Sequence, residues 1–242
     1  MSERDSIDVR RANERFHTKI DWLDSWHSFS FSSHYDPANT HHGLLLVHND
    51  DIVAPGSGFG LHAHRDMEIV TWVLEGSLEH NDSIGTKDVI TPGLAQRMSA
   101  GSGIRHSEMN ASRTEPVHLL QMWVPPDTAN LEPSYEQRDV SDAYAKGGIF
   151  PLASGREPDA AITIHQRDAT LWIGRLAPGD EATVPDAPFV HLFVARGSVD
   201  LETAGALNRG DAARLTDAGA LRVRASDDGA ELTLWETWSD LA

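Results

Sequence analysis

Short apolar segments rich in Val, Ile, Leu, Thr and Trp recur along the chain, separated by clusters of Gly, Pro, Asp and Asn. Segments of this length between turn-forming residues are typical of strands. The six clearest span residues 44–48, 69–74, 117–124, 171–176, 190–195 and 232–238. Because few stretches repeat with the period of a helix, the pattern predicts an all-β sandwich or barrel.

Two glycine-centred segments, residues 73–79 and 194–200, resemble each other. Each predicts a strand, a turn at the glycine and a second strand, so we expect two copies of one β unit. Between them, residues 126–160 hold many prolines, glycines and charges, with little apolar periodicity. This composition predicts a linker, with one short helix near Ser141–Lys146. We therefore expect domains at 1–125 and 161–242.

Composition narrows the possible chemistry. The chain has 242 residues, with 20 Lys and Arg against 37 Asp and Glu, and a net charge of −17. Such a surface repels phosphate backbones and anionic lipid, so we expect neither nucleic-acid nor membrane binding. There is no cysteine, which excludes thiolate nucleophiles and cysteine-bound metals. The polar N-terminus lacks the apolar core of a signal peptide, and no later run could span a membrane, so the expected location is the cytoplasm.

Two histidine-containing segments carry the candidate chemistry. His62 and His64 are two residues apart and follow a glycine-rich segment at 56–60, and His106 and Glu108 have the same spacing. Side chains at i and i+2 of a strand face the same side, with their Cα atoms about 7 Å apart. If the two strands are neighbours, three imidazole nitrogens and one carboxylate converge on one ion. That set leaves open positions through which substrate and O₂ could reach a metal.

The spacing leaves the acidic ligand undecided. A lone His-x-His pair is more often surface polarity or a core histidine, whereas two glycine-flanked pairs favour a metal site. Glu68 continues the parity of the first pair, so the pattern alone does not choose between Glu68 and Glu108. A Glu68 outside the site would be expected to pair with Arg65 or Arg105. The second half offers only His191 near the equivalent strand, so no second metal is expected there.

Longer runs around these residues resemble a known family. Residues 62–71, 73–76 and 97–108 together are similar to the pirin family, whose members contain two cupin domains. The resemblance is strong over residues 8–140. Residues 160–242 match only in pattern, and their short length is similar to the compact bacterial branch of the family.

The resemblance implies an all-β chain with two cupin barrels, the jelly-roll or double-stranded β-helix. It implies one divalent metal in the N-terminal barrel, usually Fe(II), with Mn, Ni, Cu, Co or Zn as alternatives. The ligands it implies are His62, His64, His106 and Glu108, which favours Glu108 over Glu68. Ala63 stands where the family commonly has proline, and it should face away from the metal.

Several bacterial relatives are described as quercetin 2,3-dioxygenases, so the resemblance implies a metal-dependent dioxygenase. Its substrates would be O₂ and a small aromatic, flavonol-like molecule whose central ring is opened with release of CO. We expect Glu108 to be the catalytic base, and Phe59, Met98, Met122 and Trp123 to form the apolar wall of the pocket. One alternative is a non-catalytic redox sensor or co-regulator that binds a protein, and another is a cupin isomerase or lyase. The oligomeric state is left open, and a monomer is compatible with the sequence.

Overall fold

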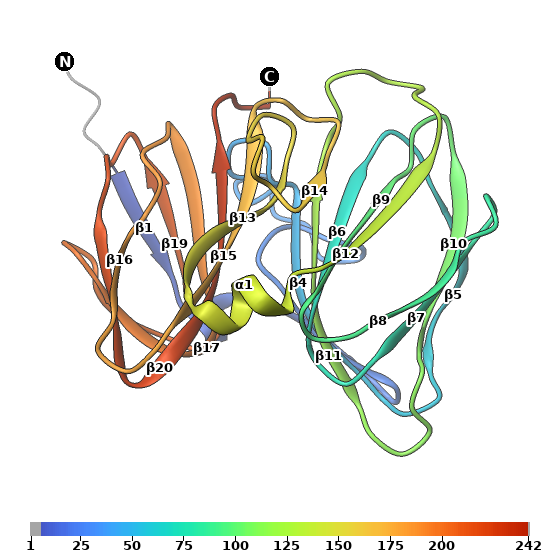
Figure 1. Ribbon diagram of the computed structural model, residues 1–242, viewed down its shortest axis with the longest axis horizontal. Coiled ribbons are helices and arrows are strands. Elements are labelled where there is room, and N and C mark those ends of the chain that lie inside the picture. The colour runs from blue at the N-terminus through green and yellow to red at the C-terminus, as the bar shows by residue number, and fades with distance from the viewer. Residues whose placement is uncertain (1–5, 242) are drawn as a thin grey trace.

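The computed structural model describes residues 6–241, which form two β-sheet halves side by side (Figure 1). The first half contains a seven-stranded sheet and a four-stranded sheet. The order of the seven-stranded sheet is β12 (Ser134–Asp139), β9 (Leu94–Ser99), β6 (Glu68–Glu75), β11 (Val117–Val124), β4 (Val47–Val53), β3 (Leu23–His27) and β2 (Phe16–Ile20). The order of the four-stranded sheet is β5 (Gly58–His64), β10 (Ile104–Asn110), β7 (Leu78–Asp82) and β8 (Lys87–Ile90).

The second half is one nine-stranded sheet built around two long strands, β17 and β20. Its main order is β1 (Ser6–Arg10), β19 (Ala212–Thr216), β17 (Phe189–Leu201), β20 (Arg222–Thr237), β15 (Ala169–Leu176), β13 (Gly148–Ser154) and β14 (Ile162–Thr163). Two further strands pair outside this order, β16 (Glu181–Thr183) with β20 and β18 (Gly205–Asn208) with β17. A 3₁₀ turn, η1 (Ala12–Glu14), follows β1, and the helix α1 (Ser141–Lys146) lies between the halves (Figure 1). The expectations of an all-β chain and of a short helix at 141–146 are confirmed.

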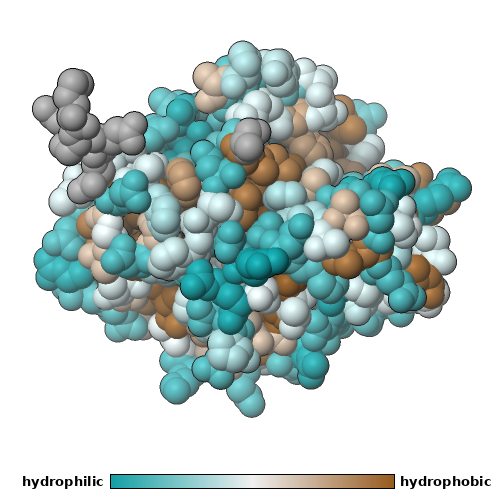
Figure 2. Space-filling view, turned by 90° about the horizontal axis from the view of Figure 1, so that it is seen from above, coloured by the Kyte–Doolittle hydropathy of each residue, from teal (hydrophilic) through white to brown (hydrophobic). Residues whose placement is uncertain are grey.

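The seven-stranded sheet is covered on both faces, which explains its unbroken apolar runs. Toward the four-stranded sheet, Leu119 belongs to an apolar cluster with Leu78 and Ile90. On its other face, Trp72 belongs to a cluster with Trp235 of the second half. Every residue of β6 except the last is therefore buried. Outside this shared core, hydrophilic side chains predominate on the face shown in Figure 2, and apolar ones form small patches.

The chain crosses between the halves more often than a simple linker would allow. Strand β1 pairs with β19 of the second half, although it lies within the segment expected to form the N-terminal domain. Within the expected linker 126–160, β12 pairs with β9 of the first half and β13 pairs with β15 of the second. Residues 126–160 therefore contribute a strand to each half. The division into folding units at 1–125 and 161–242 stays a prediction.

The two glycine-centred segments differ in the structure. Gly76, with φ of 82°, lies in the tight turn between β6 and β7, as predicted, and a Cβ there would lie 2.6 Å from the carbonyl oxygen of Pro116. Gly197, with φ of 68°, instead lies within the continuous strand β17, at an irregularity in its pairing with β20. Glycine permits both conformations, so sequence does not distinguish a turn from a bulge. Among residues 6–241, no helix has the length and hydropathy needed to span a membrane.

Candidate metal centre

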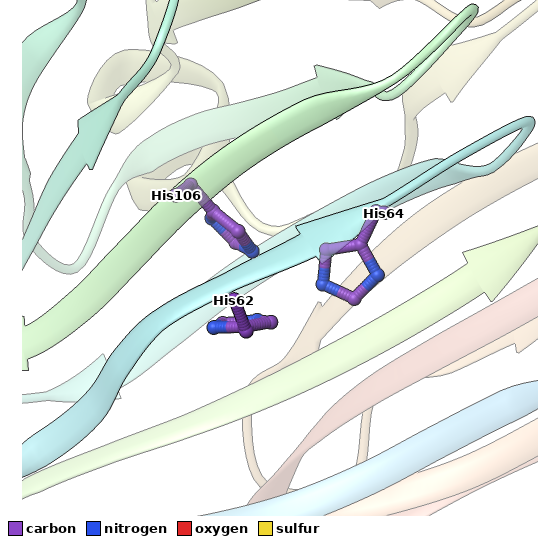
Figure 3. A group of neighbouring side chains, drawn as sticks. All are labelled: His62, His64 and His106. Carbon is purple, nitrogen blue, oxygen red and sulfur yellow. The ribbon is translucent and has the colours of Figure 1, made fainter.

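Three histidines converge where β5 and β10 lie side by side (Figure 3). His62 of β5 is directly opposite His106 of β10, and His64 is one position along the same face, opposite Ile104. The ring centroids of His62 and His106 are 4.4 Å apart, and those of His64 and His106 are 5.0 Å apart. One nitrogen from each ring lies within 4.8 Å of the others. Nitrogens bound to one ion at about 2.1 Å lie about 3–4 Å from one another, so the three rings would have to move slightly closer together to bind it.

The hydrogen bonds of His62 and His106 leave the Nε2 atom of each ring available to bind a metal ion. Nδ1 of His62 lies 2.7 Å from the carbonyl oxygen of Gly60, which can only accept, so Nδ1 carries the proton and Nε2 keeps its lone pair. A shift in the pairing of β5 with β10 occurs between His62 and Phe59, next to this carbonyl. Nε2 of His106 is buried and has no hydrogen-bond partner among residues 6–241. A buried unpaired nitrogen is costly, and coordination of a cation would satisfy it.

Burial keeps the imidazoles of His64 and His106 neutral, as metal ligation requires. Desolvation, with a further contribution from His62, lowers the pKa of His64 to about 4. Desolvation and the neighbouring His62, His64 and His80 lower the pKa of His106 to about 2. His64 and His106 therefore offer lone pairs rather than positive charge near neutral pH.

Glu108 is buried on β10, on the same face as His106. One ligand atom of Glu108 lies within 4.8 Å of those of His106 and His80, so these three residues form a second set of potential metal ligands. The side-chain amide of Gln121 on β11 donates a 2.8 Å hydrogen bond to its Oε2, and the indole N–H of Trp123 donates to Oε1 of Gln121. Burial raises the pKa of Glu108, and the hydrogen bond from Gln121 opposes this. A carboxyl with a raised pKa suits proton transfer.

Glu68 lies elsewhere. Its Oε2 accepts hydrogen bonds from the Ser99 hydroxyl, at 2.7 Å, and from the backbone N–H of His165, at 3.0 Å. It is therefore buried between β6, β9 and the loop that reaches the second half, where it stabilises the packing of the two halves. The expected partners, Arg65 and Arg105, are not the residues that it contacts.

A pocket of about 430 Å³ opens beside the cluster and is lined by His62, His64 and Glu108. Its aromatic wall consists of Trp22, Phe31, Phe59 and Trp123. The expectation holds for Phe59 and Trp123 but not for Met98 and Met122, neither of which lines the pocket. Met122 is buried on the opposite face of the sheet, in the cluster shared with the second half. Met98 is on the same face as Trp123 but is fully buried in a separate cluster with Ile69 and Ile104. The alternation of strand residues was visible in the sequence, but it does not tell which face of a doubly covered sheet borders the pocket.

The other wall of the pocket is polar and was not predicted. It includes Ser25, His27, Asn49 and Asp51. The Ser25 hydroxyl donates to Oδ1 of Asp51, and His27 Nδ1 lies 2.9 Å from Oδ1 of Asn49. Burial, and to a smaller extent the charges of Asp50 and Glu108, raises the pKa of Asp51 to about 7. The pocket thus has two acidic groups near its polar wall, facing an aromatic wall. In the second half, His191 is buried on β17 with its ring centroid 5.1 Å from that of His48.

Comparison with known proteins agrees with this architecture. Residues 8–124 match the family model described as Pirin, and residues 151–236 match the one described as quercetinase C-terminal cupin domain. A Mycobacterium tuberculosis protein named "Putative quercetin 2,3-dioxygenase" is 54% identical over 237 residues, which cover 98% of this chain and 97% of the relative. The Escherichia coli K12 protein named quercetin 2,3-dioxygenase is 40% identical over 224 residues, 92% of this chain and 95% of the relative.

Solved structures show the same similarity. The crystal structure of YhhW from E. coli has a TM-score of 0.90 with this chain, at 38% identity, and covers 98% of this chain and 99% of YhhW. The same bacterial pirin has been solved in complex with nickel(II), with a TM-score of 0.89. The two barrels seen here, their match to both family models and the level of identity lead to one conclusion: the chain belongs to the pirin family and consists of two cupin domains.

Proposed function

We propose that His62, His64, His106 and Glu108 hold one divalent metal ion at the base of the pocket. The observation that carries this proposal is the convergence of three imidazoles, of which burial keeps His64 and His106 neutral. The buried Nε2 of His106 has no hydrogen-bond partner among residues 6–241. Three nitrogens and a carboxylate accept Fe(II) as well as Mn, Ni, Cu, Co or Zn. Fe(II) is the ion we expect in the cell, and the nickel(II) complex of YhhW supports a single metal of this class.

We further propose that the chain is a quercetin 2,3-dioxygenase, which opens the central ring of a flavonol with O₂ and releases CO. The names of its relatives support this activity. When bound, the metal would act as a Lewis acid at the oxygen atoms of the substrate. The pocket fits a flat aromatic molecule, because Trp22, Phe59 and Trp123 provide flat apolar surfaces opposite the polar wall.

Different residues of the pocket would accept the substrate proton, bind the substrate and exclude water. Glu108 would accept the proton of the flavonol hydroxyl, since burial raises the pKa of its carboxyl and a Gln121 N–H orients it. Asp51, whose pKa is about 7, could donate a hydrogen bond to a polar group of the substrate while it is protonated. The aromatic wall would exclude water from the reacting ring.

The test is aerobic turnover of quercetin, followed by O₂ uptake and CO release, with metal-loaded wild type, Glu108→Gln and Glu79→Gln. Glu79 lies one residue from His80 on β7, so its side chain points to the other face of the sheet and it serves as a charge-matched control. We expect the Glu108 variant to lose at least about 100-fold in kcat, in the range typical of a lost general base, and the control to match wild type. Equal rates for all three proteins would refute the role of Glu108.

The same experiment separates the other classes of function. Stoichiometric metal binding without quercetin turnover would favour a metal-dependent sensor that binds a protein partner. Turnover of another substrate without O₂ uptake would favour an isomerase or lyase. We retain the cytoplasm as the expected location, which cell fractionation would test.

A further inference from the structure

Behind His106, two more buried residues form a hydrogen-bonded chain that leads away from the pocket. Nδ1 of His106 lies 3.5 Å from Nδ1 of His80, and Nε2 of His80 lies 3.0 Å from Oδ2 of Asp82. The pairing of β7 with β10 creates this alignment, because His106 is directly opposite Asp82 and Glu108 is directly opposite His80. His80 is completely buried, so no water competes for its nitrogens.

The chemistry of the three side chains determines which atom donates and which accepts in each of these hydrogen bonds. The Asp82 carboxylate can only accept, so Nε2 of His80 carries the proton in the bond between them. In a neutral imidazole the other nitrogen is then an acceptor, and Nδ1 of His80 receives the Nδ1–H of His106. His106 is consequently held in the tautomer whose Nε2 keeps its lone pair. That nitrogen is the buried atom without a partner on the side of His62 and His64.

Contacts with neighbouring residues hold Asp82 and His80 in position. The other carboxylate oxygen of Asp82 accepts the backbone N–H groups of Ile84 and Thr86, at 3.0 and 2.9 Å. The ring of Tyr135 packs against His80, with their centroids 4.8 Å apart. The turn after β7 and an aromatic side chain thus leave Asp82 and His80 little freedom to reorient.

We propose that Asp82 and His80 are positioning residues that select the metal-binding tautomer and the ring orientation of His106. This inference rests on the proposed metal site. The two residues touch neither metal nor substrate but act through His106, as hydrogen-bond acceptors behind ligating histidines commonly do. His80, His106 and Glu108 also lie close enough together to bind an ion themselves. If His80 were a metal ligand, the variants described below would behave differently.

Asp82→Asn is the informative variant, because it can reverse donor and acceptor in each of these hydrogen bonds without removing a side chain. The turn N–H groups of Ile84 and Thr86 would keep the amide oxygen, which leaves the amide NH₂ facing Nε2 of His80. His80 would then carry its proton on Nδ1 and donate to Nδ1 of His106, which moves the proton of His106 to Nε2. An analogous Asp→Asn change in serine proteases acts through the wrong histidine tautomer.

The first readout needs no metal. Long-range ¹H–¹⁵N correlation spectra of ¹⁵N-labelled metal-free protein report which nitrogen of each histidine is protonated. We expect Nδ1–H for His106 and Nε2–H for His80 in the wild type, and both assignments reversed in Asp82→Asn. Glu79→Gln on the same strand should keep the wild-type pattern. An Nε2–H tautomer of His106 in the wild type would overturn the proposal, and so would an unchanged pattern in Asp82→Asn.

The second readout is Ni²⁺ affinity, measured by competition with a chromophoric chelator. Loss of a partner behind a ligating histidine typically weakens metal binding about 10- to 100-fold, and we expect this of Asp82→Asn and of His80→Phe, which keeps a ring against Tyr135. Wild-type affinity in both variants would overturn the positioning role. His62→Ala separates the two proposals: if it binds Ni²⁺ like the wild type while His80→Phe does not, His80 is itself a ligand and both proposals fail. If the wild type binds no Ni²⁺, the metal site fails while the NMR result still tests the hydrogen-bonded chain.

Discussion

Asp51 gives the sharpest quantitative prediction, because it is a carboxyl group buried in a pocket and the side chain that donates a hydrogen bond to it is neutral. It is 2% exposed and accepts a hydrogen bond from Ser25. Burial raises the pKa of Asp51 from 3.8 to about 7, with smaller contributions from Asp50 and Glu108. Asp51→Asn replaces it with a neutral side chain of the same shape, which pays no cost for ionisation at any pH.

The sign and size of the effect follow from proton linkage. Between pH 3.8 and about 7, the folded protein keeps a proton on Asp51 that the unfolded chain has released. The free energy of unfolding of the wild type therefore falls as pH rises through this window, and the loss is complete above the folded-state pKa. A span of about 3 pH units at about 1.36 kcal/mol each gives about 4 kcal/mol. The stability of Asp51→Asn relative to wild type should rise by this order between about pH 4 and pH 8.

Equilibrium urea unfolding of both proteins after chelator treatment measures this difference. Comparing wild type and variant at each pH cancels the titration of all other groups that behave alike in the two proteins. Asp24→Asn is a control of opposite sign, because a hydrogen bond from Lys19 lowers the pKa of Asp24, and its stabilising contribution is lost on acidification. A stability difference between Asp51→Asn and wild type that is the same at both pH values would refute the assignment of a raised pKa to Asp51.

Three further predictions concern the metal and the contact between the halves. Gln121→Met removes a hydrogen bond to the buried Glu108 carboxylate, worth about 1.5–3 kcal/mol, so Ni²⁺ affinity measured by chelator competition should fall about 10- to 100-fold. Gln96→Met, which changes another buried glutamine on β9, is the control and should bind Ni²⁺ as the wild type does. Saturating Ni²⁺ at about 100 times its Kd should raise the free energy of unfolding by about 2.7 kcal/mol, and an unchanged thermal midpoint would argue against a site in the folded state. Trp72→Phe removes the 2.8 Å hydrogen bond from the indole N–H to Glu231, which joins the two halves. We expect the free energy of unfolding in urea to fall by about 1.5–3 kcal/mol. A fall below about 0.5 kcal/mol would show that Glu231 finds another donor.

Local pattern was sufficient for the fold class, and most of the six segments predicted as strands lie on strands of the structure. Residues 117–124 form β11 as predicted, and the predicted segment 69–74 lies within β6. The segment 44–48 was placed too early, since β4 runs from Val47 to Val53. Its first residues, Leu44 and Leu45, are instead buried in the core between the halves, and apolar pattern does not distinguish such buried loop residues from a strand.

The sequence by itself determined the spacing of the candidate ligands. His62 and His64, like His106 and Glu108, are two residues apart, and alternation along a strand then places each pair on one face whatever the rest of the chain does. Absence of cysteine and the charge of −17 likewise need no structure to limit the chemistry. These properties are local or additive, so they can be read directly from the order of residues.

Tertiary structure decided what each side chain meets. It brought His62 opposite His106, turned Glu68 toward Ser99 and the second half, and set Gln121 of another strand against Glu108. Strand pairing between distant segments fixes such contacts, and one residue of register shift would place every side chain on the opposite face. The spacing of His80 and Asp82 likewise places them on one face of β7, but their contact with His106 had no signal in the sequence. The same holds for the polar wall around Asp51, because the proximity of residues on different strands depends on register and burial.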